Sequence, residues 1–113
     1  DPLVRVATIE ALGDIEDYRA GRSLTEALSD KDLTVRRAAA KALGEIGDTT
    51  TVPALAAAYA SLDPHLCFAV IKALADMDDR RVSVTLALAK KDRDRIVRHT
   101  ASEALKDRED DDD

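Results

Sequence analysis

The chain contains few side chains that could carry out catalysis or hold a metal: two histidines, His65 and His99, and a single cysteine, Cys67. A metal site needs three or four converging ligands, and the histidines are not accompanied by such a set. Cys67 lies in an apolar stretch, where a lone cysteine is typically a small buried residue rather than a reactive thiol. No Ser/His/Asp arrangement, phosphate-binding glycine loop or nucleotide motif is present. We therefore expect no metal, no cofactor and no catalytic residue, and a non-enzymatic role is favoured.

Charged residues recur more regularly, because an arginine follows an aspartate by four residues at three equivalent positions of a repeating pattern. The pairs are Asp1 and Arg5, Asp32 and Arg36, and Asp94 and Arg98. A spacing of four brings two side chains to one face of a helix. It predicts a structural ladder of aspartates and arginines that ties together the turns of adjacent units. A row of anion-binding arginines is the less favoured alternative, because each arginine has acidic neighbours.

These pairs recur because the whole chain repeats with a period of 31 residues. The segment 1–5 returns at 32–36, 63–67 and 94–98, and an Ala-Leu pair follows each copy at the same distance. A fixed period of this size is typical of solenoids, whose units bury their apolar faces only by stacking on their neighbours. We therefore expect one solenoid domain, 1–106, with units at 1–31, 32–62 and 63–93 and a half unit at 94–106. Because the chain starts inside the pattern without a methionine, we expect it to be either a fragment of a larger protein or a processed form.

The second unit indicates how each unit folds. Asp32 can cap a helix whose apolar residues recur at spacings of three and four, and Gly44 follows the last of them as a left-handed end. Pro53 fits the first turn of a second helix, where no N–H is needed. Extended to all units, the pattern predicts an all-α, right-handed α-solenoid of stacked antiparallel helix pairs, with about seven helices at 2–12, 20–29, 33–43, 51–61, 64–75, 80–90 and 94–106. The acidic run at 107–113 is predicted to be a disordered tail.

The net charge of −6 disfavours binding to nucleic acid or to anionic lipid. The one basic cluster, from Lys90 to His99, has interleaved aspartates and no aromatic residue for base stacking, so nucleic-acid binding is not expected. No run of about 18 apolar residues predicts a membrane span, and a single cysteine fits a reducing, cytoplasmic compartment. The acidic residues are mostly Asp and the basic residues mostly Arg. This skew resembles proteins of salt-loving archaea, and ordinary compositional bias explains it equally well.

Residues 35–48 (VRRAAAKALGEIGD), followed by 52–55 (VPAL), resemble the HEAT-like repeat of the phycobilisome-lyase (PBS-lyase) type. The resemblance extends to about Leu105 and implies the helical-repeat fold. This repeat occurs in lyases, hydroxylases, adaptors and designed binders, so the resemblance alone does not decide the function. The iron-dependent deoxyhypusine hydroxylases of this family carry His-Glu pairs, whereas here Leu66 and Thr100 follow the two histidines.

In this architecture the second helices of the pairs line the concave face, where a partner can bind. The candidate contact residues on that face are Arg19, Arg22, Glu26, Thr50, Ala54, Ala57, Arg81, Thr85 and Leu88. The centre of this set is small and weakly apolar, and arginines lie at its edges, which suits a peptide or helix of a partner protein. We therefore predict a protein-interaction or scaffold module. The alternative is a bilin-lyase-like or chaperone-type accessory subunit that acts on a chromophore protein.

Overall fold

The computed structural model describes residues 1–60 and 63–111, and the regular elements within these ranges are all helical. The α-helices are α1 (Pro2–Ile15), α2 (Gly21–Ala27), α3 (Leu33–Ile46), α4 (Val52–Tyr59), α5 (Pro64–Ala75), α6 (Val82–Ala89) and α7 (Arg95–Asp111). Two short 3-10 turns, Tyr18–Ala20 and Thr49–Thr51, lead into α2 and α4. The prediction of an all-α fold with seven helices is thus confirmed over the described part of the chain.

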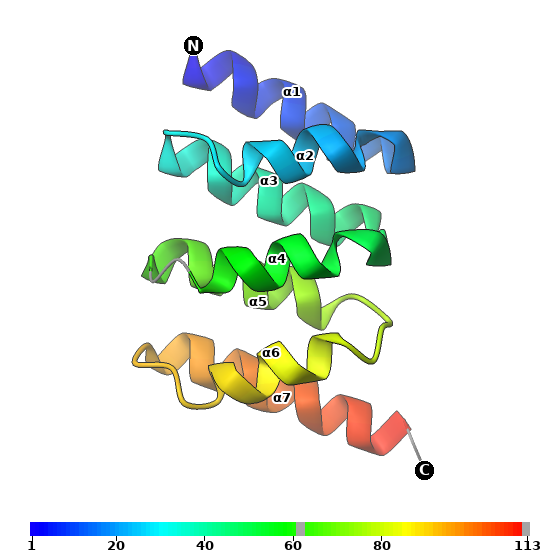
Figure 1. Ribbon diagram of the computed structural model, residues 1–113, viewed down its shortest axis with the longest axis vertical. Coiled ribbons are helices and arrows are strands. Elements are labelled where there is room, and N and C mark those ends of the chain that lie inside the picture. The colour runs from blue at the N-terminus through cyan, green and yellow to red at the C-terminus, as the bar shows by residue number, and fades with distance from the viewer. Residues whose placement is uncertain (61–62, 112–113) are drawn as a thin grey trace.

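The helices form two layers, which Figure 1 shows one in front of the other. The first-helix layer consists of α1, α3, α5 and α7, each packed on the next, and the second-helix layer consists of α2, α4 and α6. Each second helix packs on the first helix of the following unit: α2 on α3, α4 on α5 and α6 on α7. The units therefore share one core that runs along the molecule, which measures 43 × 28 × 18 Å. A stack of this kind is stabilised unit by unit through neighbour contacts.

Aspartates bind the backbone N–H groups at the start of both helical segments in the first three units and at the start of α7. Asp1, Asp32, Asp63 and Asp94 each accept an N–H from the residue two positions later, at 2.8–3.0 Å, where the first helices begin. Asp17, Asp48 and Asp79 do the same where the chain turns into the second helices, also at 2.8–3.0 Å. A carboxylate there satisfies donors that have no partner inside the helix. The capping aspartates therefore set the helix starts with the 31-residue period.

Two glycines allow neighbouring first helices to approach closely. A Cβ atom on Gly13 would lie 3.0 Å from the Cβ of Ala42, and a Cβ on Gly44 would lie 2.9 Å from the Cα of Ala73. Gly44 lies inside α3, which continues to Ile46, so the prediction that it ends its helix is wrong. The left-handed end is Gly47, with φ 71°, because the apolar stripe of α3 continues to the buried Ile46.

The last helix is longer than the sequence pattern predicted. Of the acidic run at 107–113, residues 107–111 continue α7 rather than forming a disordered tail, and residues 112–113 lie outside the described residues. The physical reason is Arg108, which reaches back from α7 and donates hydrogen bonds to the main-chain carbonyls of Leu74 (3.3 Å) and Met77. These bonds attach the extra turn of α7 to the end of α5.

Candidate functional site

The outward side of α2, α4 and α6, here called the second-helix face, carries most of the predicted contact residues. Those that are exposed are Arg19, Arg22, Glu26, Thr50, Ala57, Arg81 and Leu88, and Ala54 is half-buried. Thr85 is a correction, since it is only 6% exposed. It belongs with Val82 and Leu86 to the inward stripe of α6, at helical spacings of three and four. The residue that lies outward in its place is Val84, which the sequence reasoning missed.

Val84 and Leu88 form an exposed apolar pair one helical turn apart on α6, with 69% and 61% of their surfaces exposed. The equivalent residues one unit earlier are Pro53 and Ala57 on α4, which are also exposed, and α4 packs beside α6. These four residues are called the apolar patch. Large side chains left in water at neighbouring positions of a folded protein mark a surface suited to binding.

One unit earlier again, the same two positions are charged. Arg22 and Glu26 occupy them on α2, and their side chains approach to 3.7 Å. Because both side chains are largely exposed, this pair contributes little to stability. The second-helix face therefore changes from charged at α2 to apolar at α4 and α6, so the apolar patch has a definite charged margin.

Two arginines of the second-helix face bind the aspartates that precede the second helices. Arg19 binds Asp17 through both carboxylate oxygens, and Arg81 binds Asp79 at 2.9 Å. Arg81 also donates to the main-chain carbonyl of Thr49 at 2.9 Å, which links the third unit to the second. The side-chain hydrogen bonds from Arg81 are the main reason that the pKa of Asp79 is lowered to about 2. Within the described chain, Arg81 is therefore held by two partners, whereas Arg19, whose side chain is 91% exposed, makes a surface ion pair alone.

The predicted ladder residues lie where the units meet, but their partners differ from the predicted ones. Arg5 binds both carboxylate oxygens of Asp30, at 2.9 and 3.2 Å. Arg36 donates to the main-chain carbonyl of Asp30 at 2.7 Å and lies 3.5 Å from Asp63, which caps the next unit. Each of these arginines thus reaches an inter-unit turn.

Arg98 has a similar position, donating to the main-chain carbonyls of Asp92 and Arg93 at 2.8 and 2.9 Å. The aspartates that precede the arginines by four residues, Asp1, Asp32 and Asp94, accept main-chain N–H groups of their own helices instead. Spacing of four put each pair on one helix face, but the capping geometry turns the carboxylate toward the backbone. The arginines consequently connect inter-unit turns and do not pair with the aspartates four residues before them.

In the third unit the ladder arginine is replaced by Cys67, and a tyrosine makes the link. The hydroxyl of Tyr59 donates to the carboxylate of Asp92 at 2.7 Å, and the thiol of Cys67 lies 3.3 Å from the main-chain oxygen of Tyr59. Burial, followed by the nearby Asp92 carboxylate, raises the pKa of the Tyr59 hydroxyl well above its usual value. Cys67 is buried, which confirms the expectation of a small core residue.

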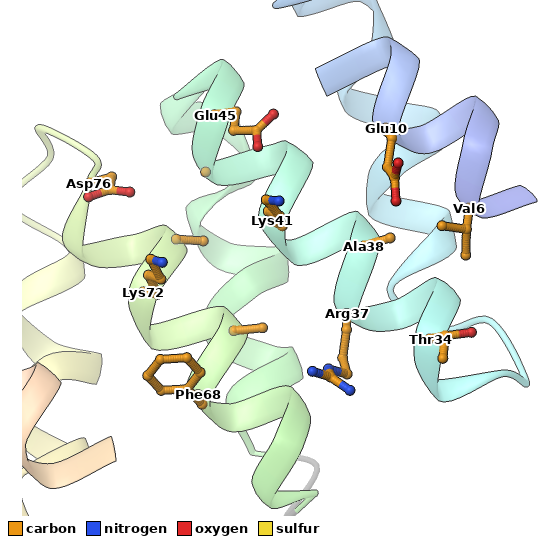
Figure 2. A pocket seen from close by; sticks show the side chains of 13 residues that line it. Val6, Glu10, Thr34, Arg37, Ala38, Lys41, Glu45, Phe68, Lys72 and Asp76 are labelled. Atoms are coloured by element: carbon orange, nitrogen blue, oxygen red, sulfur yellow. The ribbon is translucent and has the colours of Figure 1, made fainter. Parts of the chain in front are cut away.

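A second surface feature lies across α1, α3 and α5, and the sequence reasoning did not anticipate it. It is a groove of about 590 Å³, here called the first-helix groove, and Figure 2 shows the side chains that line it. Its small residues are Ala38, Gly44, Ala69 and Ala73, and its larger apolar residues are Val6 and Phe68. The Phe68 side chain, the only phenylalanine of the chain, remains 37% exposed.

The charges of the first-helix groove are arranged in rows across the helices. Lys41 on α3 and Lys72 on α5 occupy the same repeat position, and Arg37 lies one turn before Lys41 (Figure 2). Glu45 and Asp76 lie one turn after the lysines. Among the described residues, the three cations take part in no ion pair within 4.0 Å. Positive charge is therefore available on α3 and α5, with Glu45 and Asp76 one turn beyond the lysines and Glu10 at the lysine position of α1.

Repeated helix pairs with a shared core define an α-helical repeat protein. Residues 1–64 match the family of HEAT repeats, and this match covers more than half of the chain. The protein belongs to the HEAT-repeat family. No curated protein is similar enough in sequence to match the chain.

Neither a metal site nor a membrane-spanning helix is found among the described residues. No three His, Cys, Asp or Glu residues among them come together as a metal site would require. Within the same described ranges, no helix has both the length and the apolar character needed to cross a membrane.

Proposed function

We propose that this chain is a protein-interaction module and that a partner protein or peptide docks on the second-helix face, over the apolar patch. HEAT repeats are generally protein-interaction scaffolds, which supports the class of function. The observation that carries the position of the site is the exposure of Val84 and Leu88, 69% and 61%, on one face of α6.

The chemistry of the second-helix face fits a helix or an extended peptide with an apolar anchor. Binding energy in protein interfaces is concentrated in a few apolar or aromatic anchors that lose contact with water, surrounded by a polar rim. Val84 and Leu88 offer the apolar surface, and Ala57 leaves room beside them for a partner side chain. Arg22 and Arg81 lie at the margin, where they can orient an acidic or carbonyl group of the partner.

The substitution Ala57→Glu tests this site. Ala57 is exposed, so the free energy of unfolding should change by less than about 1 kcal/mol. A charge in the centre of the docking site should weaken partner binding by roughly 2 kcal/mol or more. Affinity capture from a lysate of the source cells, read out by mass spectrometry, compares the wild type with this variant.

The matched control is Ala11→Glu, which places the same charge on an exposed alanine of α1, outside the second-helix face. Loss of captured proteins with Ala57→Glu but not with Ala11→Glu supports the proposal. Equal capture by all three proteins, with unchanged unfolding curves, contradicts it.

The finer resemblance to the phycobilisome-lyase type of HEAT-like repeat leads to a second hypothesis, an accessory subunit for a chromophore protein. It rests on the sequence of residues 35–48, which form most of α3, and therefore ranks below the interaction module. Mixing the protein with a free bilin provides the test. A shift of the bilin absorbance spectrum supports the accessory role, and an unchanged spectrum argues against it.

A further inference from the structure

We infer that the first-helix groove is a second docking surface, and that its occupant is an acidic protein segment with an apolar anchor side chain. The inference shares with the proposed function only the premise that the chain binds proteins. The surface lies on the other layer of the molecule, on α1, α3 and α5, and its charges differ from those of the second-helix face.

The shape of the groove follows from where the first helices touch. The glycine contacts that bring α3 against α5, and α1 against α3, lie toward the C-terminal ends of these helices, at Gly44 and Gly13. Nearer their N-terminal ends, Ala38 and Ala69 line the groove, and their short side chains leave a trough. A trough with a small-residue floor admits an incoming side chain without moving the helices.

Phe68 provides an apolar contact at one wall of this trough. Its ring extends from α5 on the same side as the lysines (Figure 2) and is 37% exposed. The equivalent residue on α3 is Arg37 and that on α1 is Val6, so the row across the three helices is apolar, basic and aromatic. An apolar side chain of a partner can cover the exposed ring and remove its surface from water.

The cations select the charge of the occupant. Arg37, Lys41 and Lys72 are exposed and, within the described chain, lie beyond 4.0 Å from any acidic partner, although Glu45 and Asp76 follow the lysines by four residues. In a protein of net charge −6, three such cations around one groove favour an incoming carboxylate.

The acidic residues that also line the groove determine where the bound segment lies in it. Glu45 and Asp76 repel an acidic segment from one side, and Glu10 repels it from the α1 wall. The segment therefore crosses α3 and α5 between the lysine row and the row of Arg37 and Phe68. The same acids repel the phosphates of a nucleic acid, whose bases would also find only one aromatic ring here, so a protein segment is favoured.

The experiment uses a short fluorescein-labelled peptide of alternating Glu and Asp around central leucines, titrated with the full chain and followed by fluorescence anisotropy. The variant Lys41→Glu/Lys72→Glu should bind the peptide at least about tenfold more weakly than the wild type. The control Lys31→Glu/Lys90→Glu has the same net charge and changes two exposed lysines outside the groove, so its affinity should change by less than about threefold. Absence of wild-type binding, or equal weakening by both variants, overturns the inference.

A second peptide, with alanines in place of the leucines, tests the apolar anchor. The wild type should prefer the leucine peptide, and Phe68→Ala should remove that preference even where it changes the stability of α5, because both peptides are measured on the same variant. An unchanged preference in Phe68→Ala contradicts the anchor. Two other results would overturn the acidic segment as the occupant. If a single-stranded oligonucleotide binds more tightly than the leucine peptide, the occupant is a nucleic acid. If the chain self-associates in sedimentation and Lys41→Glu/Lys72→Glu abolishes this, the occupant is a second copy of the chain.

The variant Ala57→Glu separates this inference from the proposed function. It should leave peptide binding in the first-helix groove unchanged, because Ala57 lies on α4 in the other layer. If only Lys41→Glu/Lys72→Glu loses peptide binding, the result supports the first-helix groove as the site of the acidic segment. If only Ala57→Glu loses partner capture, the result supports the second-helix face as the docking site of the proposed function.

Discussion

The helices at the two ends of the molecule, α1 and α7, occupy the same position in the repeat but have different outer surfaces. On α1, Val4 and Ile15 are 62% and 69% exposed, whereas their equivalents on α3, Val35 and Ile46, are 0% and 6% exposed. α1 thus keeps the apolar residues that the preceding unit covers elsewhere in the stack, in addition to an exposed Leu3.

On α7, polar residues replace the small or apolar ones. Lys106 lies at the position of Gly13 and Gly44, which on α1 and α3 faces the following unit, and it is exposed. Arg108 lies at the position of Ile46 and Met77 and binds main-chain carbonyls at the end of α5. The comparison teaches that the burial of a repeat position depends on its neighbouring unit and is not a property of the residue type.

The largest expected effect comes from the same substitution at two equivalent positions. Val35→Asp should lower the free energy of unfolding by roughly 3 kcal/mol or more, because it buries an unpaired charge. Val4→Asp should lower it by less than about 1 kcal/mol, because Val4 is exposed. Both residues are the third of their helix, so helix-end effects cancel, and urea unfolding measures the difference. Equal losses at the two positions would show that α1 is covered as α3 is.

A smaller effect should distinguish the close-packed interior from α7. Gly44→Ala should destabilise the fold by roughly 1–3 kcal/mol, because the added methyl group meets the Cα of Ala73 at 2.9 Å. Lys106→Ala, at the equivalent position of α7, should change stability by less than about 0.5 kcal/mol. Thermal unfolding followed by circular dichroism measures both. Stabilisation by Gly44→Ala, as helix propensity alone predicts, would contradict the close contact.

The next effect concerns the attachment of the last turn of α7. Arg108→Met removes the hydrogen bonds to the carbonyls of Leu74 and Met77 and should lower stability by about 1 kcal/mol. Amide hydrogen exchange should also become faster in the last turns of α7. Arg95→Met, an exposed change at the start of the same helix, is the control. Unchanged exchange in Arg108→Met would mean that α7 keeps its length without this attachment.

The smallest effect is a pH dependence near the same end. The hydrogen bonds from Arg81, with a minor contribution from Arg108, lower the pKa of Asp79 to about 2, below its value in an unfolded chain. The resulting stabilisation is present above the unfolded-state pKa and is lost as the pH falls from about 4 to about 2. Asp79→Asn should therefore lose less stability over this range than the wild type in urea unfolding at each pH. If the free energy of unfolding falls equally with pH in the two proteins, Asp79 does not contribute to the pH dependence.

The fold was largely predictable from the sequence because its information is periodic. The 31-residue repeat predicted the seven helices, and Asp32 predicted the start of α3 by a local interaction of the kind that sequence patterns capture. The end of α3 was not predicted, because Gly44 is required by a contact with α5, and Arg108 extends α7 through a contact with α5 as well. These features depend on residues about one unit away in the chain.

The candidate site was less predictable for the same physical reason. At α6 the predicted Arg81 and Leu88 are exposed, but Thr85 was expected outside and is buried, and the exposed Val84 was missed. Adjacent residues of a helix point about 100° apart, so a choice that is wrong by one residue exchanges an exposed side chain for a buried one. The first-helix groove is formed jointly by α1, α3 and α5, so no local sequence pattern marks it.

Hydrogen–deuterium exchange of the protein with and without its captured partner tests the central claim most directly. If the partner docks on the second-helix face, binding should slow amide exchange in α4 and α6, around Ala57 and Leu88, while exchange in α1 stays unchanged. Slower exchange confined to α1, α3 and α5, with α4 and α6 unaffected, would contradict the docking of a partner on the apolar patch.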